Sequence, residues 1–340
     1  MKPHHLLRNG LTLVALALGL AEWTEPGLRK IIRESYRLVK GYVPNETSIE
    51  EDPDGVPWVN YGQFQGQWVG RRRNPVTVCQ RAFEHEQAWR AGQTAARSKF
   101  FNCATWLLEH AVVRDELAFY EYSNPWYYNL TPPWRSAMAN GQALQVLVRA
   151  HQRTGDERFL SLARQLLAAL QTPVECGGLC YQAEEGWWFE EYVCADGTQP
   201  RVLNGMIFTW LGIREYQQYT ADPAAEVLLD QGLRALQARL PDYGRPGGYS
   251  VYDALGQPAG DYHAIHVDLL DQLHRLTGEP IFGRYRDLWA TYRGRSTERF
   301  AVRLFKRPGG MNLAVLGANL LLGAGLMALG RRICRRRGGR

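Results

Sequence analysis

Residues 136–170 read SAMANGQALQVLVRAHQRTGDERFLSLARQLLAAL, and this stretch sets the fold class. Apolar residues recur at helical spacings from 136 to 151, the turn Thr154-Gly-Asp interrupts them, and a second helical pattern runs from 157 to 170. Two helices joined by a short turn form a helical hairpin. The stretch therefore predicts one such hairpin, whose apolar faces must pack against neighbouring elements.

The same pattern recurs along the chain. Pairs of helices are predicted at three further places, of which the first carries the weakest signal: 76–89 with 94–111, 203–219 with 224–240, and 262–276 with 281–292. Hairpins in series must bury their faces against one another. We therefore expect a mainly α fold over residues 54–300, an incomplete (α/α) toroid of about four helical hairpins.

Two long connections interrupt the series, at 171–200 and 241–260, and both are rich in Gly, Tyr and Trp. Loops of this length in a compact domain are usually functional. Both lead into the first helix of a hairpin, so we expect them on the same rim. Tyr181-Gln followed by Gly186-Trp-Trp-Phe predicts a small β-hairpin, and Gly248-Tyr-Ser-Val-Tyr predicts a strand. An aromatic rim with interspersed charges suits a sugar chain, although most of these aromatic side chains will serve packing.

The composition excludes two classes of protein. Of 340 residues, 45% are hydrophobic and 11% aromatic, which is too apolar for a disordered chain. The 40 basic residues exceed the 34 acidic ones, but the last ten residues contain six arginines and no acid. The rest of the chain is therefore balanced in charge. A nucleic-acid-binding surface spread over the fold is excluded, and we expect no nucleic-acid partner.

Residues 312–330 carry no charge and would rise about 28 Å as a helix, enough to cross a hydrocarbon core. Lys306 and Arg307 precede this stretch, whereas the basic tail 331–340 comes after it. The positive-inside rule then places the C-terminus in the cytoplasm and the body on the exoplasmic side, which is periplasmic, extracellular or lumenal. The alternative is a buried core helix.

The N-terminal segment 1–23 resembles an export signal. Lys2 and Arg8 precede an apolar stretch at 11–21, as in a signal peptide or an N-terminal anchor. In either case the chain after residue 23 is exported, in agreement with the C-terminal charges. Residues 24–53 are expected to form an amphipathic linker or helix.

Five of the six cysteines lie in the body, where an exported compartment would permit disulfides. Cys176, Cys180 and Cys194 cluster around a Gly-Gly turn with no histidine among them, which favours one disulfide over a zinc site. Cys79 and Cys103 could bridge two helices, but burial as small hydrophobic residues is favoured.

Four motifs occur in order along about 123–293: Ser136-Ala-Met-Ala-Asn-Gly-Gln-Ala, Trp188-Phe-Glu-Glu-Tyr, Val202-Leu-Asn-Gly-Met-Ile-Phe and Asp261-Tyr-His-Ala-Ile-His. Together they resemble the C-terminal catalytic domain of D-glucuronyl C5-epimerases, which convert glucuronate to iduronate in heparan-type glycans. The resemblance implies an (α/α) toroid that acts on a uronic-acid polymer, with the glutamate and tyrosines of these motifs in the site.

A fainter match reaches back through Asn74-Pro-Val-Thr-Val to Asp54-Gly-Val-Pro. Two departures from the family stand out. Asn74 occupies a position where the family often has a tyrosine, and nothing between the first helical hairpin and Tyr120 is long enough to form the β-rich domain of the animal enzymes.

Inversion at C5 of a uronate requires a base on one face, an acid on the other and groups that neutralise the carboxylate. Glu190 and Glu191 offer the carboxylate, and neighbours in an extended segment point to opposite sides, so only one can face the substrate. The resemblance favours Glu191 and leaves Glu190 structural, paired with an arginine. Tyr262 and Tyr252 are the phenolic candidates for proton transfer, with Tyr192 next.

Substrate contacts are expected from Arg135, Asn204, His263, Glu190 and Trp188. Arg135 and Asn204 lie at predicted helix starts, where backbone N–H groups suit a substrate carboxylate. His263 and His266 are three residues apart on one helix face, but no third metal ligand is evident. We expect neither a metal nor another cofactor.

These features predict a membrane-anchored isomerase, a uronyl C5-epimerase acting on a heparan sulfate or heparosan-like glycan. A polysaccharide lyase is the nearest alternative because it shares proton abstraction at C5, and an inactive glycan-binding relative is another. A hydrolase is disfavoured because adjacent glutamates do not supply two separated carboxylates. The sequence leaves open which polymer is used, how it is sulfated or acetylated, whether the N-terminal segment is cleaved, and whether the chain forms a homodimer.

Overall fold

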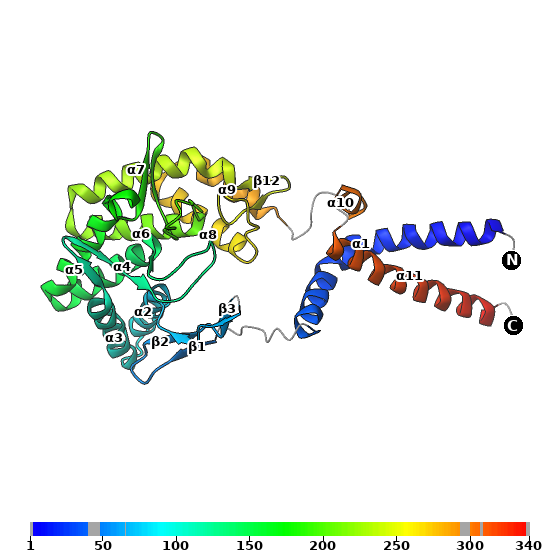
Figure 1. Cartoon of the computed structure of the whole chain (residues 1–340), viewed down its shortest axis with the longest axis horizontal. Helices are drawn as coiled ribbons and strands as arrows, with labels where there is room; N and C mark the ends of the chain where they lie inside the picture. Colours follow the sequence, from blue (N-terminus) through cyan, green and yellow to red (C-terminus); the bar gives the residue numbers. More distant parts are fainter. Residues whose placement is uncertain (1–2, 40–47, 65, 293–299, 307–308, 338–340) are drawn as a thin grey trace. The chain divides into compact units, whose positions relative to one another are not determined.

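The structure is a computed structural model that describes residues 3–39, 48–64, 66–292, 300–306 and 309–337 (Figure 1). The chain divides into two compact units. Asn45–Thr291 forms one unit, here called the body, and Met1–Pro44 together with Tyr292–Arg340 forms the other, here called the terminal unit.

The described part of the body contains four helical hairpins, and the mainly helical fold predicted above is confirmed. The hairpins are α2 (Pro75–Arg90) with α3 (Ala95–His110), α4 (Ala137–Thr154) with α5 (Glu157–Gln171), α6 (Leu203–Thr220) with α7 (Pro223–Arg239), and α8 (Tyr262–Thr277) with α9 (Pro280–Ala290). The first helix of each hairpin also packs on the first helix of the next, so α2, α4, α6 and α8 form a row.

Local sequence explains where these helices begin and end. Asn74, Ser136 and Asp222 accept hydrogen bonds from backbone N–H groups in the first turns of α2, α4 and α7. Gly155 ends α4 with a φ of 68°, in the left-handed region that favours glycine. Asn74 therefore serves as a helix cap.

Short antiparallel strands fill the connections. In the described residues they pair as β1 (Ser48–Glu51) with β2 (Pro57–Asn60) and β2 with β5 (Arg71–Arg72), β3 (Gln63–Phe64) with β4 (Gln67–Trp68), β6 (Val112–Arg114) with β7 (Leu117–Phe119), β8 (Glu121–Tyr122) with β9 (Trp134–Arg135), β10 (Cys180–Ala183) with β11 (Gly186–Phe189), and β12 (Gly244–Arg245) with β13 (Tyr249–Ser250). Two 3₁₀ turns, Val174–Cys176 and Leu240–Tyr243, precede β10 and β12.

The two predicted loop structures are present. The hairpin β10–β11 pairs Tyr181 with Trp188, and β13 lies within the strand predicted at 248–252. The sheet β1–β2–β5 corrects one expectation, because β1 lies within residues 24–53, which were expected to form a linker or helix. β1 and β2 form a hairpin across residues 52–56, and β5 adds a third strand. The three strands contain 4, 4 and 2 residues, too few for a clear alternating pattern.

The terminal unit contains α1 (Pro3–Val39), α10 (Phe300–Lys306) and α11 (Gly310–Arg337). Helices α1 and α11 run antiparallel side by side, so the beginning of α1 lies beside the end of α11 (Figure 1). A polar contact joins them, in which the Thr24 hydroxyl donates to Oδ1 of buried Asn319 over 2.8 Å.

Among the described residues, one stretch is long and apolar enough to be a candidate membrane span: Gly310–Gly330, with a mean hydropathy of 1.9. It contains the span predicted at 312–330. Helix α1 continues without a break through residues 21–23, where a signal peptide would end. Cleavage at that point stays a prediction.

Candidate active site

The two adjacent glutamates of the β11 motif have different surroundings. Glu190 is fully buried, and its carboxylate accepts hydrogen bonds from the backbone N–H groups of Tyr192 at 3.3 Å and Arg201 at 3.0 Å. Burial raises the pKa of Glu190 to about 8. Both oxygens therefore hold the loop 191–201 in place. The arginine partner expected for Glu190 is Arg201, which donates its backbone N–H and not its guanidinium group.

Glu191 is 7% exposed, and the Oε2 atom of its carboxyl is buried without a hydrogen-bond partner. Burial raises the pKa of Glu191 to about 7. Gly205, in the first turn of α6, leaves room for this carboxyl, because a Cβ atom there would lie 2.1 Å from Oε2. A carboxyl with one unpartnered oxygen and a pKa near neutrality suits proton transfer.

Three predicted tyrosines from three separate segments lie together. The hydroxyls of Tyr192 and Tyr252 are 3.4 Å apart, and the rings of Tyr252 and Tyr262 are 4.9 Å apart. Burial, followed by the negative charge of Glu191, raises the pKa of each of the three phenols. They are therefore protonated at neutral pH and able to donate. Tyr262 is the most accessible of the predicted tyrosines, at 42% exposed.

A fourth tyrosine joins this group and was missed by the sequence analysis. The ring of Tyr128 lies 5.3 Å from that of Tyr192, and its hydroxyl donates to Oδ2 of buried Asp253 over 2.6 Å. The backbone of Tyr128 has a φ of 60°, a strained conformation for a tyrosine. Neither residue belongs to the motifs, and their contact joins positions far apart in the sequence.

Of the predicted substrate contacts, Asn204 has an unpartnered side-chain oxygen, whereas Arg135 and Trp188 have partners within the body. Asn204 is buried beside Gly205, and its Oδ1 atom has no partner. Arg135 is engaged within the body, because it donates to Glu121 at 3.1 Å and to the Gly177 carbonyl at 2.8 Å. Trp188 is buried and stacks on Tyr243, with ring centroids 5.9 Å apart.

The histidine pair contacts a serine. Nδ1 of His263 lies 2.8 Å from the Ser250 hydroxyl, and Nδ1 of His266 lies 3.0 Å from it. Burial lowers the pKa of both histidines, that of His266 to about 3, so both are neutral. In the parts of the chain that the structure describes, no group of three His, Cys, Asp or Glu residues is placed to hold a metal ion.

The cysteines of the described body are all free. The disulfide predicted within the group Cys176, Cys180 and Cys194 is therefore wrong for this structure: Cys176 is exposed, whereas the other two are buried. Burial of Cys79 and Cys103, the favoured interpretation for that pair, is confirmed.

Comparison with known proteins gives a family match, and two of the curated relatives are described here. The family model for the D-glucuronyl C5-epimerase C-terminus matches residues 115–291. An uncharacterized protein of Methanocaldococcus jannaschii is 35% identical over 270 residues, which cover 73% of this chain and 86% of that protein. The D-glucuronyl C5-epimerase of Caenorhabditis elegans is 30% identical over 183 residues, which cover 48% of this chain but only 29% of that enzyme.

Solved structures with a similar fold are more distant. A cellobiose 2-epimerase from Bacillus thermoamylovorans has a TM-score of 0.48 at 11% identity and covers 86% of each chain. A GH76 α-mannanase from Bacteroides thetaiotaomicron has a TM-score of 0.47 at 15% identity and covers 95% of this chain and 87% of that one. Neither similarity bears on the reaction.

Proposed function

Because the chain belongs to the D-glucuronyl C5-epimerase C-terminus family, we propose that it inverts C5 of glucuronate residues within a polysaccharide. The family is one of carbohydrate epimerases, and the substrate and mechanism are our proposal. The observation that carries the proposal is the Glu191 carboxyl, which is buried, has an oxygen without a partner and lies near a group of protonated tyrosines.

In the proposed reaction, ionised Glu191 takes the proton from C5. The electron pair of the broken C–H bond moves into the adjacent uronate carboxylate, which becomes an enediolate. A tyrosine on the opposite face then returns a proton to C5 and becomes a phenolate. We assign this role to Tyr262, the accessible phenol, and assign Tyr192 and Tyr252 to the return of protons between Glu191 and Tyr262.

The developing charge on the uronate carboxylate needs hydrogen-bond donors. Helix α6 begins at Leu203 with no side-chain cap. The Leu203 N–H donates to the Tyr252 carbonyl at 3.1 Å, which leaves the next two N–H groups, those of Asn204 and Gly205, at the positive end of the helix dipole. We propose that these groups and the amide of Asn204 bind the carboxylate. Glu190, Arg135, Trp188 and His263 would then position the loops that carry the site.

Deuterium incorporation tests the reaction. The full chain in detergent, incubated in D₂O with glucuronate-containing polymers, should place deuterium at C5 without shortening the polymer. A lyase passes through the same carbanion but yields unsaturated ends that absorb in the near ultraviolet, and a hydrolase creates new reducing ends. Unsaturated ends would overturn the epimerase proposal, and binding without any exchange would favour an inactive relative.

We further propose that the four hairpins form an incomplete (α/α) toroid and that α11 anchors it in a membrane. The apolar stretch Gly310–Gly330 and the arginines after it support an anchor with a cytoplasmic C-terminus. The body would then lie on the exoplasmic side.

A further inference from the structure

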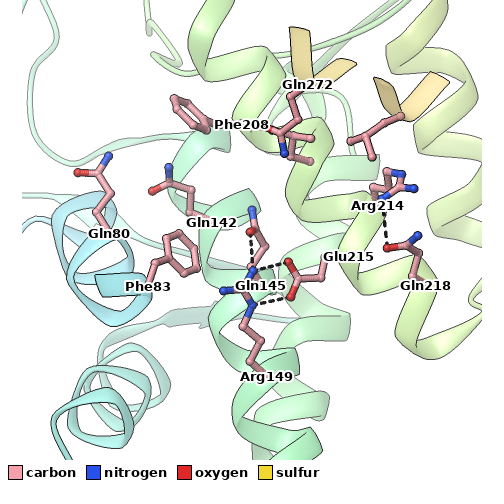
Figure 2. Close-up of a pocket in the computed structure, with 12 residues that line it drawn as sticks. Gln80, Phe83, Gln142, Gln145, Arg149, Phe208, Arg214, Glu215, Gln218 and Gln272 are labelled. Atoms are coloured by element: carbon pink, nitrogen blue, oxygen red, sulfur yellow. Dashed lines mark hydrogen bonds and ion pairs between the residues drawn. The ribbon is translucent and has the colours of Figure 1, made fainter. Parts of the chain in front are cut away.

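Two features lie outside the candidate active site: a cavity in the body and an apolar face of the terminal unit. The cavity, of about 630 Å³, lies among α2, α4, α6 and α8 (Figure 2). Its two arginines are engaged by neighbouring side chains, because Arg149 binds both oxygens of Glu215 and Arg214 donates to the Gln218 amide. The apolar face is exposed, and its composition indicates what covers it.

Helices α1 and α11 pack against each other along the candidate span. Two contacts set the register of this pairing: Arg29 donates to Asn312, and a Cβ atom on Gly323 would lie 3.4 Å from the Leu16 side chain. Because the helices are antiparallel and have the same rise per residue, these contacts place the candidate span of α11 beside about residues 10–30 of α1. Helix α1 therefore lies at the depth of α11 in any membrane that α11 crosses.

The outward face of this part of α1 is apolar. Leu11 and Val14 are exposed, Ala17 and Ala21 are fully buried, and residues 9–21 contain no charge. Helix α11 also exposes apolar side chains, those of Leu313, Leu321, Leu322, Leu326 and Leu329. Two adjacent helices that expose apolar side chains over the same depth are unfavourable in water and are typical of contact with lipid acyl chains.

The charged residues that follow the apolar stretch of α1 lie beside the first half of the α11 span and are paired within the terminal unit. The Glu22 carboxylate accepts from the Phe300 N–H at 2.6 Å, and Glu25, which is 8% exposed, binds Arg29 at 2.7 Å. Polar groups at membrane depth must find partners in the protein, because lipid offers none. The glutamates make α1 less apolar than α11, and their pairing removes this obstacle to a second span.

We propose that α1 crosses the membrane beside α11, so that the terminal unit is a two-helix membrane hairpin whose outward partner is lipid. The inference rests on the proposed anchor. Arg8 of α1 and Arg331 of α11 lie at the same end of the antiparallel pair, and the positive-inside rule puts that end in the cytoplasm. Residues 1–23 are then retained, because cleavage there would remove the part of α1 that packs on Gly323.

Labelling of introduced cysteines in membranes tests this proposal. Val14→Cys on α1 and its control Val227→Cys on α7 replace the same residue at similar exposure, 44% and 47%. In membranes opened by freeze–thaw, a membrane-impermeant maleimide reaches both aqueous sides. It should label Val227→Cys readily and leave Val14→Cys unlabelled, because lipid covers position 14. Mass spectrometry of the labelled peptides separates these sites from the native cysteines.

Leu321→Cys, at an exposed position of α11, reports on the anchor itself. Protection of both Val14→Cys and Leu321→Cys is expected. Labelling of both would refute the anchor and the second span together, whereas labelling of Val14→Cys alone would refute only the second span. The intact mass of the purified chain checks retention independently: the mass of all 340 residues is expected, and a chain that begins after residue 21 would overturn the proposal.

Discussion

Glu190 and Glu191 are neighbours in sequence, yet their carboxyl groups differ in partners. Glu190 accepts two backbone hydrogen bonds, whereas Glu191 keeps an unpartnered oxygen next to Gly205. The sequence analysis could separate them only through the family resemblance. The contacts now give a physical reason for the same preference, and the catalytic role of Glu191 stays a prediction.

Glu191→Gln should reduce C5 exchange by about 10²- to 10⁴-fold, the usual contribution of a general base, while the shape of the side chain is nearly kept. Exchange into a glucuronate polymer and the melting temperature measure the two effects. Glu184→Gln is the control, because Glu184 is an exposed glutamate in the turn between β10 and β11. Retention of most of the activity in a folded Glu191→Gln protein would place the base elsewhere.

The raised pKa of Glu191 predicts the pH dependence of exchange. As a base, Glu191 must be ionised, so the rate should rise about tenfold per pH unit below pH 7 and level off above it. Because Gln at 191 cannot titrate, the small residual rate of Glu191→Gln should lack this limb. A rate that is flat between pH 5 and 8 would contradict the assignment.

The stability of the fold should change with pH in the direction opposite to the exchange rate, falling as the pH rises. The folded-state pKa values of about 8 for Glu190 and about 7 for Glu191 lie above the ordinary value of 4.5. The folded chain thus binds more protons than the unfolded chain in this window, and the stabilisation is lost as pH rises from about 4.5 toward 8. Thermal melts should therefore show a falling melting temperature from pH 5 to 8, with a smaller fall in Glu190→Gln. A melting temperature that rises over this range would contradict the burial of these carboxyls.

At the scale of elements, the contact between α4 and α6 depends on two glycines. A Cβ atom on Gly212 would lie 1.8 Å from the Gly141 carbonyl oxygen, and one on Gly141 would lie 2.5 Å from the Thr209 backbone. Both obstacles are backbone atoms, which cannot rotate away.

Gly212→Ala should therefore force α4 and α6 apart and destabilise the body by about 1 to 3 kcal/mol, as overpacking does. Chemical denaturation measures the change. Gly232→Ala provides the comparison, because a Cβ atom there would first meet the tip of the Phe189 ring, at 2.9 Å, and a side chain can adjust. Equal costs for both substitutions would show that the helix contact is softer than its geometry implies.

At the scale of the whole molecule, the chain consists of a body that carries the candidate site and a terminal unit built from both ends of the sequence. The terminal unit holds the candidate span and the basic tail. Ala21 of α1, Phe300 of α10 and Val315 of α11 form one buried apolar cluster. An anchor of this kind would involve the N-terminal helix as well as the C-terminal one.

Cysteine labelling checks the proposed topology. Cys176 is exposed in the body, and Cys334 lies beyond the candidate span. In spheroplasts, a membrane-impermeant maleimide should label Cys176 at once and Cys334 only after lysis, because the arginine-rich end stays inside. Cys176→Ser and Cys334→Ser variants identify which residue carries the label. Labelling of Cys334 in intact spheroplasts would reverse the orientation.

The sequence alone predicts the hairpins and the loop strands around Trp188 and Tyr249. The candidate residues Glu191, Tyr192, Tyr252 and Tyr262 were selected with the help of the family resemblance, and their roles stay predictions. The secondary structure depends on local information. Helical periodicity, capping residues and turn residues act over a few positions, so one stretch of sequence is enough to specify them.

Tertiary packing was needed to learn which groups are buried and which meet. The contact of Tyr192 with Tyr252 and the bond from Tyr128 to Asp253 join residues that no short pattern connects. The unpartnered Oε2 atom of Glu191 and the free cysteines likewise depend on packing. The physical reason is that the pKa of a buried group depends on how far it is removed from water and on which groups lie beside it. Parts of the chain that are distant in sequence determine both when the core brings them together.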